Sequence, residues 1–233
     1  MPAPQADAAS GAGPGSISDS ISGQQTVSQS ASPALSTVHP HTPTVSTWVQ
    51  RWAGVIRPCG SVLDLACGGG RHARFLAARG HAVEAVDRDA AALATLSGVT
   101  GISTRCADLE GGAWPYAGRS FDAIVVSNYL HRPLLPLIAA TLAPGAVLIY
   151  ETFRAGNESY GKPSNSAFLL QPGELLAFAQ GADLQIIGFE DGFRAQPSPA
   201  MIQRICAARP PLPAAAQALP EWLPALLPAM VPT

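Results

Sequence analysis

The chain has 233 residues, of which 47% are hydrophobic and 13% charged, and its formal net charge is −2. This composition suits one globular domain, and the absence of clustered Lys and Arg argues against nucleic acid and anionic membrane surfaces as partners. No apolar run in the sequence reaches the ~18 residues that a membrane-spanning helix needs, so we expect a cytoplasmic protein with no membrane association.

The two ends of the sequence differ from its middle. Residues 1–43 are dominated by Ser, Ala, Gly, Pro and Gln, and this apolar content is too low to offset ordering entropy, so we expect a disordered extension. Residues 209–233 are rich in proline, which excludes a long helix. This tail either drapes over the domain or recruits a protein partner. The folded domain is therefore predicted at 44–208.

Helical and strand patterns alternate along this domain. A helix with a tryptophan stripe comes first, at 45–56. Strands are then predicted at 61–67, 81–87, 101–109, 121–128 and 146–153, with helices at 70–80, 88–96 and 133–142 between them. A helix at 173–180 and two strands at 182–192 and 200–209 follow. This order predicts an α/β fold, a doubly wound, mostly parallel seven-stranded Rossmann-like sheet with a final antiparallel strand.

A glycine-rich turn lies between the first predicted strand and the helix that follows it. Gly68, Gly70 and Ala73 fit the pattern GxGxxG/A, which brings backbone close to a ligand and directs helix N-terminal amides at it. Asp87 ends the next strand, where a carboxylate can accept hydrogen bonds from both hydroxyls of a ribose. Together these features indicate a cofactor that contains adenosine; the alternative for Asp87 is a plain surface acid.

NAD(P) and S-adenosylmethionine (SAM) both satisfy this pattern, and three features favour SAM. Asp64 lies four residues before Gly68, where a carboxylate suits an ammonium group, unless it only caps local amides. Asp108 and Leu109 offer adenine a hydrogen-bond acceptor and an apolar neighbour, unless Asp108 only forms a turn. A dehydrogenase would need a second mononucleotide-binding half, for which too little chain follows Phe153. An NAD(P)-binding oxidoreductase and a catalytically silent interaction module remain the two alternatives.

At these motifs the sequence resembles the class I SAM-dependent methyltransferases. Residues 63–89 resemble the glycine-rich first motif and acidic second motif of that family, and residues 106–111 resemble its adenine-contact motif. Residues 121–132 and 142–153 resemble its fourth motif and its fifth-strand segment. Within the family, the chain is most similar to a small bacterial branch that includes tellurite-resistance methyltransferases. The resemblance implies in-line transfer of a methyl group from SAM to a small-molecule acceptor.

The resemblance also implies roles for individual residues. Asp64 would orient the methionine ammonium group, and Gly68 and Gly70 would leave room for the methionine. The acid of the second strand would bind the ribose, the Asp-Leu pair after the third strand would face adenine, and the Ser-Asn pair after the fourth would face the sulfonium. The expected SAM-binding residues are Asp64, Ala66, Gly68, Gly70, Asp87, Arg88, Asp108, Leu109, Ser127 and Asn128.

The acceptor side offers weaker signals, because a sulfonium methyl is already activated and the protein mainly has to position the acceptor and exclude water. Tyr129 and His131 follow the fourth strand and Glu151 ends the fifth, so these three are the candidate catalytic residues. Glu151 would accept a proton, unless it forms a solvated pair with Arg154. The alternative for His131 is a structural role at a helix start. Residues 127–131 lack the Asn-Pro-Pro-aromatic signature of methyltransferases that act on nucleic-acid bases.

Two further expectations concern the cysteines and the long polar loop. Four cysteines lie far apart without a CxxC pair, so we expect buried, reduced thiols and no metal site; they are Cys59, Cys67, Cys106 and Cys206. The loop from Arg154 to Pro172 is expected to close over the site as a lid, with Tyr160 either contacting the acceptor or packing the loop.

Overall fold

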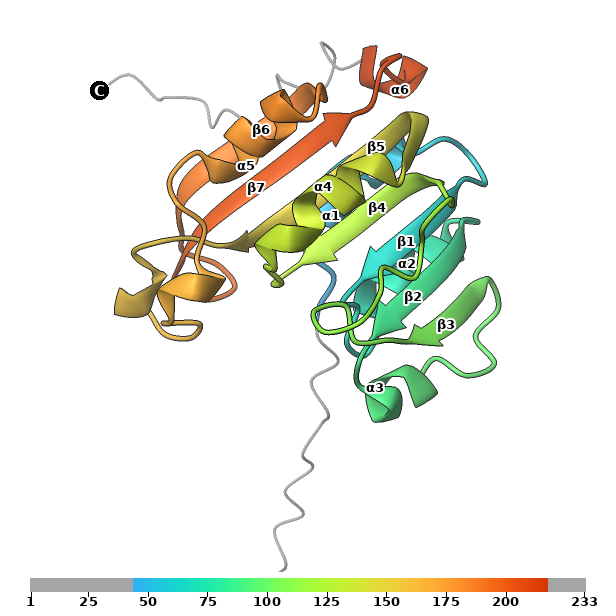
Figure 1. The fold of residues 1–233 in the computed structure, drawn as a ribbon, viewed down its shortest axis with the longest axis horizontal. Coiled ribbons are helices and arrows are strands. Elements are labelled where there is room, and N and C mark those ends of the chain that lie inside the picture. Colours follow the sequence, from blue (N-terminus) through green and yellow to red (C-terminus); the bar gives the residue numbers. More distant parts are fainter. Residues whose placement is uncertain (1–43, 218–233) are drawn as a thin grey trace, which may run out of the picture. The chain divides into compact units, whose positions relative to one another are not determined.

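The computed structural model describes residues 44–217. Residues 1–43, which the sequence predicts to be disordered, lie outside the described residues. So do residues 218–233, the last part of the proline-rich tail. Seven strands form one sheet in the order β3-β2-β1-β4-β5-β7-β6 (Figure 1). Neighbours from β3 to β5 are parallel, whereas β7 is antiparallel to both β5 and β6. The predicted doubly wound sheet with one antiparallel strand near its edge is confirmed.

The elements follow the predicted alternation closely. The strands are β1 (Ser61–Leu65), β2 (Ala82–Asp87), β3 (Ile102–Cys106), β4 (Phe121–Ser127), β5 (Leu142–Phe153), β6 (Gln185–Arg194) and β7 (Ala200–Ala208). The α-helices are α1 (Thr47–Trp52), α2 (Arg71–Ala78), α3 (Ala90–Ala94), α4 (Leu135–Ala140), α5 (Glu174–Gly181) and α6 (Ala214–Gln217). Short 3₁₀ helices lie at Ala53–Val55, Arg132–Leu134, Asn157–Ser159 and Ser166–Phe168.

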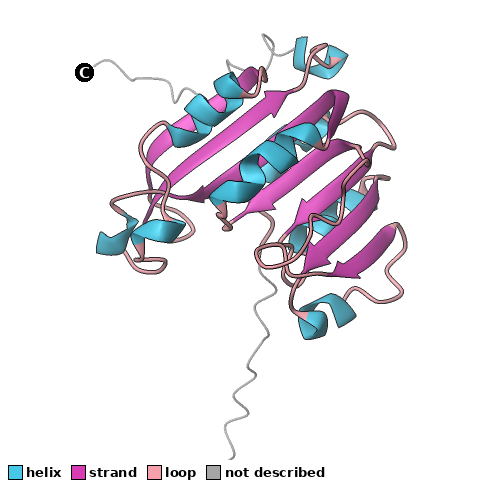
Figure 2. Cartoon of the chain, viewed as in Figure 1, coloured by secondary structure: helices cyan, strands magenta, loops and turns pink. Residues whose placement is uncertain are grey.

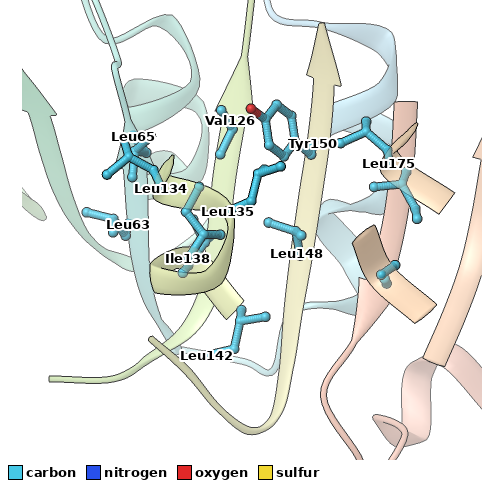
Figure 3. Packing of buried hydrophobic residues seen from close by; sticks show 14 of the residues in the cluster. Leu63, Leu65, Val126, Leu134, Leu135, Ile138, Leu142, Leu148, Tyr150 and Leu175 are labelled. Carbon is cyan, nitrogen blue, oxygen red and sulfur yellow. The ribbon is translucent and has the colours of Figure 1, made fainter. Parts of the chain in front are cut away.

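Helices cover both faces of the sheet (Figure 2). On one face, α4 and α5 pack against a cluster that includes Leu63, Val126 and Leu148, all fully buried (Figure 3). On the other face, α1 and α2 pack against a second cluster that contains Trp48 and Trp52. Because the parallel strands are buried on both faces, they consist of near-continuous apolar runs, which explains why the sequence shows them so clearly.

The segment that joins α4 to β5 differs from the prediction. The helix ends at Ala140, and the hydroxyl of Thr141 donates to the Leu137 carbonyl, while Leu142 already pairs with Phe121 in the sheet. The β5 strand therefore begins four residues earlier than the predicted 146. Its pairing with β4 shifts register between Phe121 and Ala123. This irregularity accommodates a Pro-Gly pair within a strand, which the sequence alone indicates as a turn.

The cysteine prediction was wrong for most of the four residues. All four thiols are free, but Cys59 and Cys106 are exposed, Cys67 is half-buried and only Cys206 is buried. Cys59 lies in the turn before β1, and Cys106 ends β3, an edge strand with mostly exposed side chains. Position in a turn or at an edge decides exposure here, and neither follows from the general tendency of cysteine to be buried.

Three further observations bear on the predicted boundaries and partners. Beyond the predicted domain end at 208, Leu212 and Ala216 pack against the cluster beneath α1, so the first part of the tail lies against the sheet. Among residues 44–217, no helix is both long and apolar enough to cross a membrane. Within the same residues, no group of three His, Cys, Asp or Glu side chains is arranged to hold a metal ion.

Candidate cofactor and acceptor site

Two cavities adjoin each other at the carboxyl ends of β1, β2 and β4, where the strand order reverses. In open α/β sheets this switch point is the usual ligand site. The first cavity measures about 380 Å³ and the second about 330 Å³. Ala66 and Asn128 line both, and each has a positive φ, 54° and 57°. Non-glycine residues rarely adopt this conformation, so strained backbone is concentrated where the two cavities meet.

The glycine turn leaves open space on the second cavity. A Cβ atom added to Gly68 or Gly69 would meet no atom within 4 Å, and both residues line this cavity. Gly70 differs, because a Cβ there would lie 2.5 Å from Cδ1 of Leu96. The expectation that Gly70 leaves room for a ligand is therefore corrected: it lines neither cavity, and its missing side chain allows α2 to pack against Leu96. Gly69, which lines the second cavity, leaves open space there instead.

Asp64 lies at the floor of the second cavity. Its side chain is 1% exposed and accepts a hydrogen bond from the Ala73 amide at 2.9 Å. Burial raises the pKa of this carboxyl to about 7, only partly opposed by the Ala73 amide and the Arg71 charge. The predicted alternative, capping of a local amide, is thus present in the structure. Within residues 44–217 this carboxyl forms no ion pair, and the ammonium group of a ligand would supply one.

Asp87 connects the glycine turn to the first cavity. Its Oδ2 accepts a hydrogen bond from the Gly68 amide at 2.7 Å, and its Oδ1 accepts one from the Asp89 amide at 2.9 Å. An ionised carboxylate has about four acceptor positions, so each oxygen retains one for a ligand hydroxyl. The side chain lines the first cavity. Backbone hydrogen bonds therefore fix the Asp87 carboxylate at the cavity, which disfavours the alternative that Asp87 is only a surface acid.

Residues at the ends of β2 and β3 complete the first cavity. Arg88, Asp108 and Leu109 all line it, and Leu109 also belongs to the buried core. Asp108 accepts a hydrogen bond from the Glu110 amide at 3.0 Å, and hydrogen bonds from the Glu110 and Gly111 amides lower the pKa of its carboxyl. The turn predicted as the alternative role of Asp108 is present, and the turn holds the carboxylate at the cavity.

The end of β4 bridges the cofactor and acceptor sides. The Ser127 hydroxyl accepts a hydrogen bond from Arg71 at 3.0 Å and donates one to Oε1 of Glu151 at 3.2 Å. The Asn128 amide donates to the Glu151 carbonyl at 3.0 Å. Both predicted residues line the second cavity, and β5 holds them in place through these bonds.

The three candidate catalytic residues are not brought together. Tyr129 lines the first cavity, and its hydroxyl is buried without a hydrogen-bond partner among residues 44–217. Burial first, and then the neighbouring Glu110 carboxylate, raise the pKa of this tyrosine. His131 lines neither cavity; it precedes a 3₁₀ helix, with Nδ1 4.0 Å from Glu110 Oε2. Of the three candidates, Tyr129 alone lines one of the two cavities.

Glu151 also differs from its predicted surroundings. It is 5% exposed and pairs with Arg204, whereas Arg154 pairs with Asp191, so the solvated Glu151–Arg154 pair is not formed. The next residue, Thr152, lines the first cavity instead. Successive side chains of a strand point to opposite faces, so a shift of one residue decides which of the two faces the cavity. The sequence does not reveal which of these two side chains at the end of β5 points toward the cavity.

The long loop after β5 borders the first cavity. Pro163 and Phe168 line it, and Phe168 remains 49% exposed. Arg132 holds this loop, because its guanidinium donates to the carbonyls of Ala167 and Leu169 at 3.0 and 2.8 Å. Tyr160 packs on Phe193, with ring centroids 5.2 Å apart, and lines neither described cavity. The proposed closure of the loop stays a prediction.

Several residues that line the cavities were not among the predicted site residues. In the second cavity they are Cys67, Gly69, Arg71, His72 and Arg74, and in the first they are Ala107, Glu110, Leu130, Thr152, Pro163 and Phe168. Those at the start of α2 follow the glycine turn directly, so their position was a usable signal. His72 Nε2 accepts the Ser46 amide, and burial lowers its pKa to about 3. Nothing in the loop sequence singles out Pro163 or Phe168.

Comparison with known proteins agrees with this geometry. Residues 62–145, which contain both the glycine turn and the acids that end β2 and β3, match the family model described as a methyltransferase domain. This part of the chain is similar to a methyltransferase domain. No curated protein matches the sequence of this chain.

Solved methyltransferase structures share the fold. TehB from Haemophilus influenzae superposes with a TM-score of 0.60 at 20% identity, over 72% of this chain and 63% of that one. N-methyltransferase NodS from Bradyrhizobium japonicum WM9 gives a TM-score of 0.56 at 16% identity, over 70% and 93% of the two chains. A Burkholderia thailandensis 1,6-didemethyltoxoflavin-N1-methyltransferase gives 0.51 at 18% identity, over 70% and 78%. The chain thus spans less than two thirds of the TehB chain.

These findings confirm the predicted Rossmann-like fold, and they agree with the predicted resemblance to class I SAM-dependent methyltransferases, whose cofactor is SAM. The toxoflavin enzyme was crystallised with S-adenosylhomocysteine, the product of SAM. The NAD(P)-binding alternative is not favoured by any of these matches.

Proposed function

We propose that this methyltransferase domain transfers the SAM methyl group to a small organic acceptor. The observation that carries the proposal is the pair of adjoining cavities that share Ala66 and Asn128. One presents Asp87 to a ribose, and the other presents Asp64 and two bare glycines to an amino acid. A nucleoside joined to an amino acid needs both kinds of surface side by side.

The residues present fit this cofactor. Gly68 leaves a space that a Cβ would otherwise occupy, Asp64 forms no ion pair within residues 44–217, and Asp87 retains free acceptor positions. In the proposal, Asp87 and Arg88 hold the ribose, Asp108 and Leu109 hold adenine, and Asp64, Ser127 and Asn128 hold the methionine end. When bound, SAM supplies a methyl group that is already activated by its positive sulfur.

The chain's own contribution is orientation and exclusion of water. Tyr129 borders the acceptor space while its hydroxyl, which burial keeps protonated, is turned into the protein. Thr152 offers a polar group on the same cavity, and Phe168 borders it from the loop. Glu151 faces Ser127 and Arg204, so we assign it to hold the ends of β4 and β7 in place rather than to receive the acceptor's proton.

The small size of the acceptor is part of the proposal. One structural relative is named for methylation of 1,6-didemethyltoxoflavin, and Tyr129, Thr152 and Phe168 line the same cavity as the residues expected to hold the ribose and adenine. The sequence predicts an acceptor other than nucleic acid and a cytoplasmic location, and both stay predictions. A protein partner for the proline-rich tail also stays open.

A thermal-unfolding titration tests the cofactor assignment. S-adenosylhomocysteine at 100 times its dissociation constant should stabilise the chain by about 2.7 kcal/mol, whereas NAD⁺ and NADP⁺ should leave the melting temperature unchanged. Stabilisation by a nicotinamide dinucleotide alone would contradict the proposal. Methyl transfer from radiolabelled SAM to a panel of small amines, thiols and phenols would then identify the acceptor class.

A further inference from the structure

The second cavity carries charges of both signs. Asp64 lies at its floor, and Arg71 and Arg74 line it from the first turn of α2. Neither arginine forms an ion pair with Asp64 in the described part of the chain. An α-amino acid carries an ammonium group and a carboxylate on one carbon, so it binds best where a negative and a positive group lie on the same cavity. The second cavity meets this condition.

Arg71 is held in place by groups on either side of it. Its side chain is half-buried, with Nη1 donating to the Thr44 carbonyl at 3.2 Å and Nη2 donating to the Ser127 hydroxyl at 3.0 Å. The Ser127 hydroxyl is itself oriented, because it donates to Oε1 of the buried Glu151 at 3.2 Å. A long side chain that is already restrained loses less conformational entropy when it binds a ligand. Arg71 is therefore arranged in advance of binding.

The guanidinium of Arg71 can still bind an anion. A guanidinium has more N–H donors than the two bonds to Thr44 and Ser127 use. Arg71 forms no ion pair within residues 44–217, so its charge is not neutralised by direct contact with a carboxylate there. The planar fork of a guanidinium matches a carboxylate with two parallel hydrogen bonds. A carboxylate in this cavity would be repelled by ionised Asp64 and attracted to Arg71.

Arg74 lines the same cavity but is engaged elsewhere. Its side chain is exposed, and its Nη2 donates to the carbonyl of Thr95, the residue that ends α3. Arg71 differs because its partner Ser127 itself lines the second cavity. The bonded end of Arg71 is thus at the cavity, between α2 and β4. This geometry favours Arg71 over Arg74 as the group that meets an anion.

We propose that Arg71 binds the carboxylate of the methionine part of SAM and makes the site selective for adenosyl compounds that carry this group. The inference rests on the proposed function and names the residue that decides which such compounds bind. Asp64 takes the ammonium group and Arg71 takes the carboxylate, so the amino acid is held at two points. Arg71 acts through binding and takes no part in bond exchange.

A matched pair of ligands tests this inference on the full chain. The pair is S-adenosylhomocysteine and its decarboxylated analogue, which keeps the amino group and lacks only the carboxylate. Calorimetry measures both affinities for the wild type and for Arg71→Gln, Arg71→Met, Arg71→Lys and Arg74→Gln. Arg79→Gln is the control, because Arg79 is an exposed residue at the end of α2 that stacks on Phe75 and lines neither cavity.

The wild type and Arg79→Gln should bind S-adenosylhomocysteine at least about tenfold more tightly than the decarboxylated analogue, as expected for one bidentate ion pair. Arg71→Gln and Arg71→Met should bring the two affinities within about threefold of each other, by weakening S-adenosylhomocysteine alone. Arg71→Lys should keep part of the preference, and Arg74→Gln should keep all of it. A variant with general damage to the site would weaken both ligands alike, so the ratio of affinities separates binding from a structural role.

Three results would overturn the inference. The first is a wild type that binds both ligands equally. The second is a preference that survives in both neutral variants of Arg71 or is lost in Arg74→Gln, because backbone amides or Arg74 would then hold the carboxylate. The third is an equal loss of affinity for both ligands in the neutral Arg71 variants, which would make Arg71 a structural residue.

The proposed function fails separately. A wild type that binds neither ligand rejects the cofactor assignment and, with it, the inference. A wild type that binds both ligands equally retains an adenosyl cofactor and loses only the role of Arg71. Thermal unfolding of each variant verifies that the fold is intact before the affinities are compared.

Discussion

The cofactor half of the site and its acceptor half are built in different ways. Most of the proposed cofactor half comes from residues 64–109, a continuous stretch in which each of three acids lies within two residues of a strand end and accepts a hydrogen bond from a backbone amide. The proposed acceptor half draws on the end of β4, on β5 and on the loop at 154–172, which are far apart in sequence. A site built from local turns can be predicted from the sequence, whereas a site built from long-range contacts cannot.

The largest expected effect lies in the packing of the cofactor half. Gly70→Ala places a Cβ 2.5 Å from Leu96 and forces alanine to adopt a φ of 72°. Strain and overpacking should together lower the free energy of unfolding by about 2–4 kcal/mol. Gly69→Ala is the matched control, because its Cβ meets no atom within 4 Å. Denaturant titration should show a loss only for Gly70→Ala; equal stability of both variants would refute the packing role.

The next effect concerns the acid that joins the turn to the first cavity. Asp87→Ala removes the acceptor of the Gly68 amide and the expected ribose ligand. We expect S-adenosylhomocysteine to bind at least tenfold more weakly, about 1.4 kcal/mol. Glu158→Ala, an exposed loop acid that lines neither cavity, should bind as the wild type does. Calorimetry that gives equal affinities for Asp87→Ala and the wild type would remove Asp87 from the site.

A pH dependence should distinguish Asp64 from the other acids. Its pKa of about 7 in the free protein means that the carboxylate must lose a proton before it can pair with an ammonium group. S-adenosylhomocysteine affinity should therefore rise about eightfold between pH 6 and 7.5, as the deprotonated fraction grows. Asp64→Asn should bind more weakly at pH 7.5 and show a flatter profile. Parallel profiles for the two proteins would contradict a role for this ionisation.

The raised pKa of Asp64 also affects the stability of the fold, which should change with pH in the opposite direction to the affinity. Because the folded pKa of Asp64 lies above its ordinary value of 3.8, its contribution to the free energy of unfolding falls as pH rises from about 4 through 7. His72, with a folded pKa of about 3, contributes in the other direction below pH 6.5. Both the wild type and Asp64→Asn retain His72, so the difference between their unfolding free energies isolates Asp64.

The smallest expected effect lies in the acceptor half. If residues 154–172 close over the first cavity, amides near Pro163 and Phe168 should exchange more slowly when S-adenosylhomocysteine is bound. Arg132→Gln removes the hydrogen bonds to the Ala167 and Leu169 carbonyls and should reduce this protection severalfold. Hydrogen exchange followed by mass spectrometry measures both. Unchanged exchange in the loop on ligand binding would reject closure.

The sequence by itself determined the sheet and the cofactor half. Apolar runs such as that of β4 are buried on both faces and read directly as parallel strands, and the glycine turn with Asp64 and Asp87 depends on spacing within about 25 residues. Cofactor residues predicted on this basis line the two cavities, with Gly70 as the exception, since its collision partner Leu96 lies in a distant turn.

Only the tertiary structure decided the acceptor half. Whether Glu151 or Thr152 faces a cavity depends on strand phase, which a buried strand with apolar residues on both faces does not reveal. Glu151 is joined to Arg71 of α2 through Ser127 of β4 and to Arg204 of β7, and no periodic pattern records that these side chains meet. Local backbone geometry follows from nearby residues, whereas the pairing of charged side chains from different strands follows from the packing of the whole sheet.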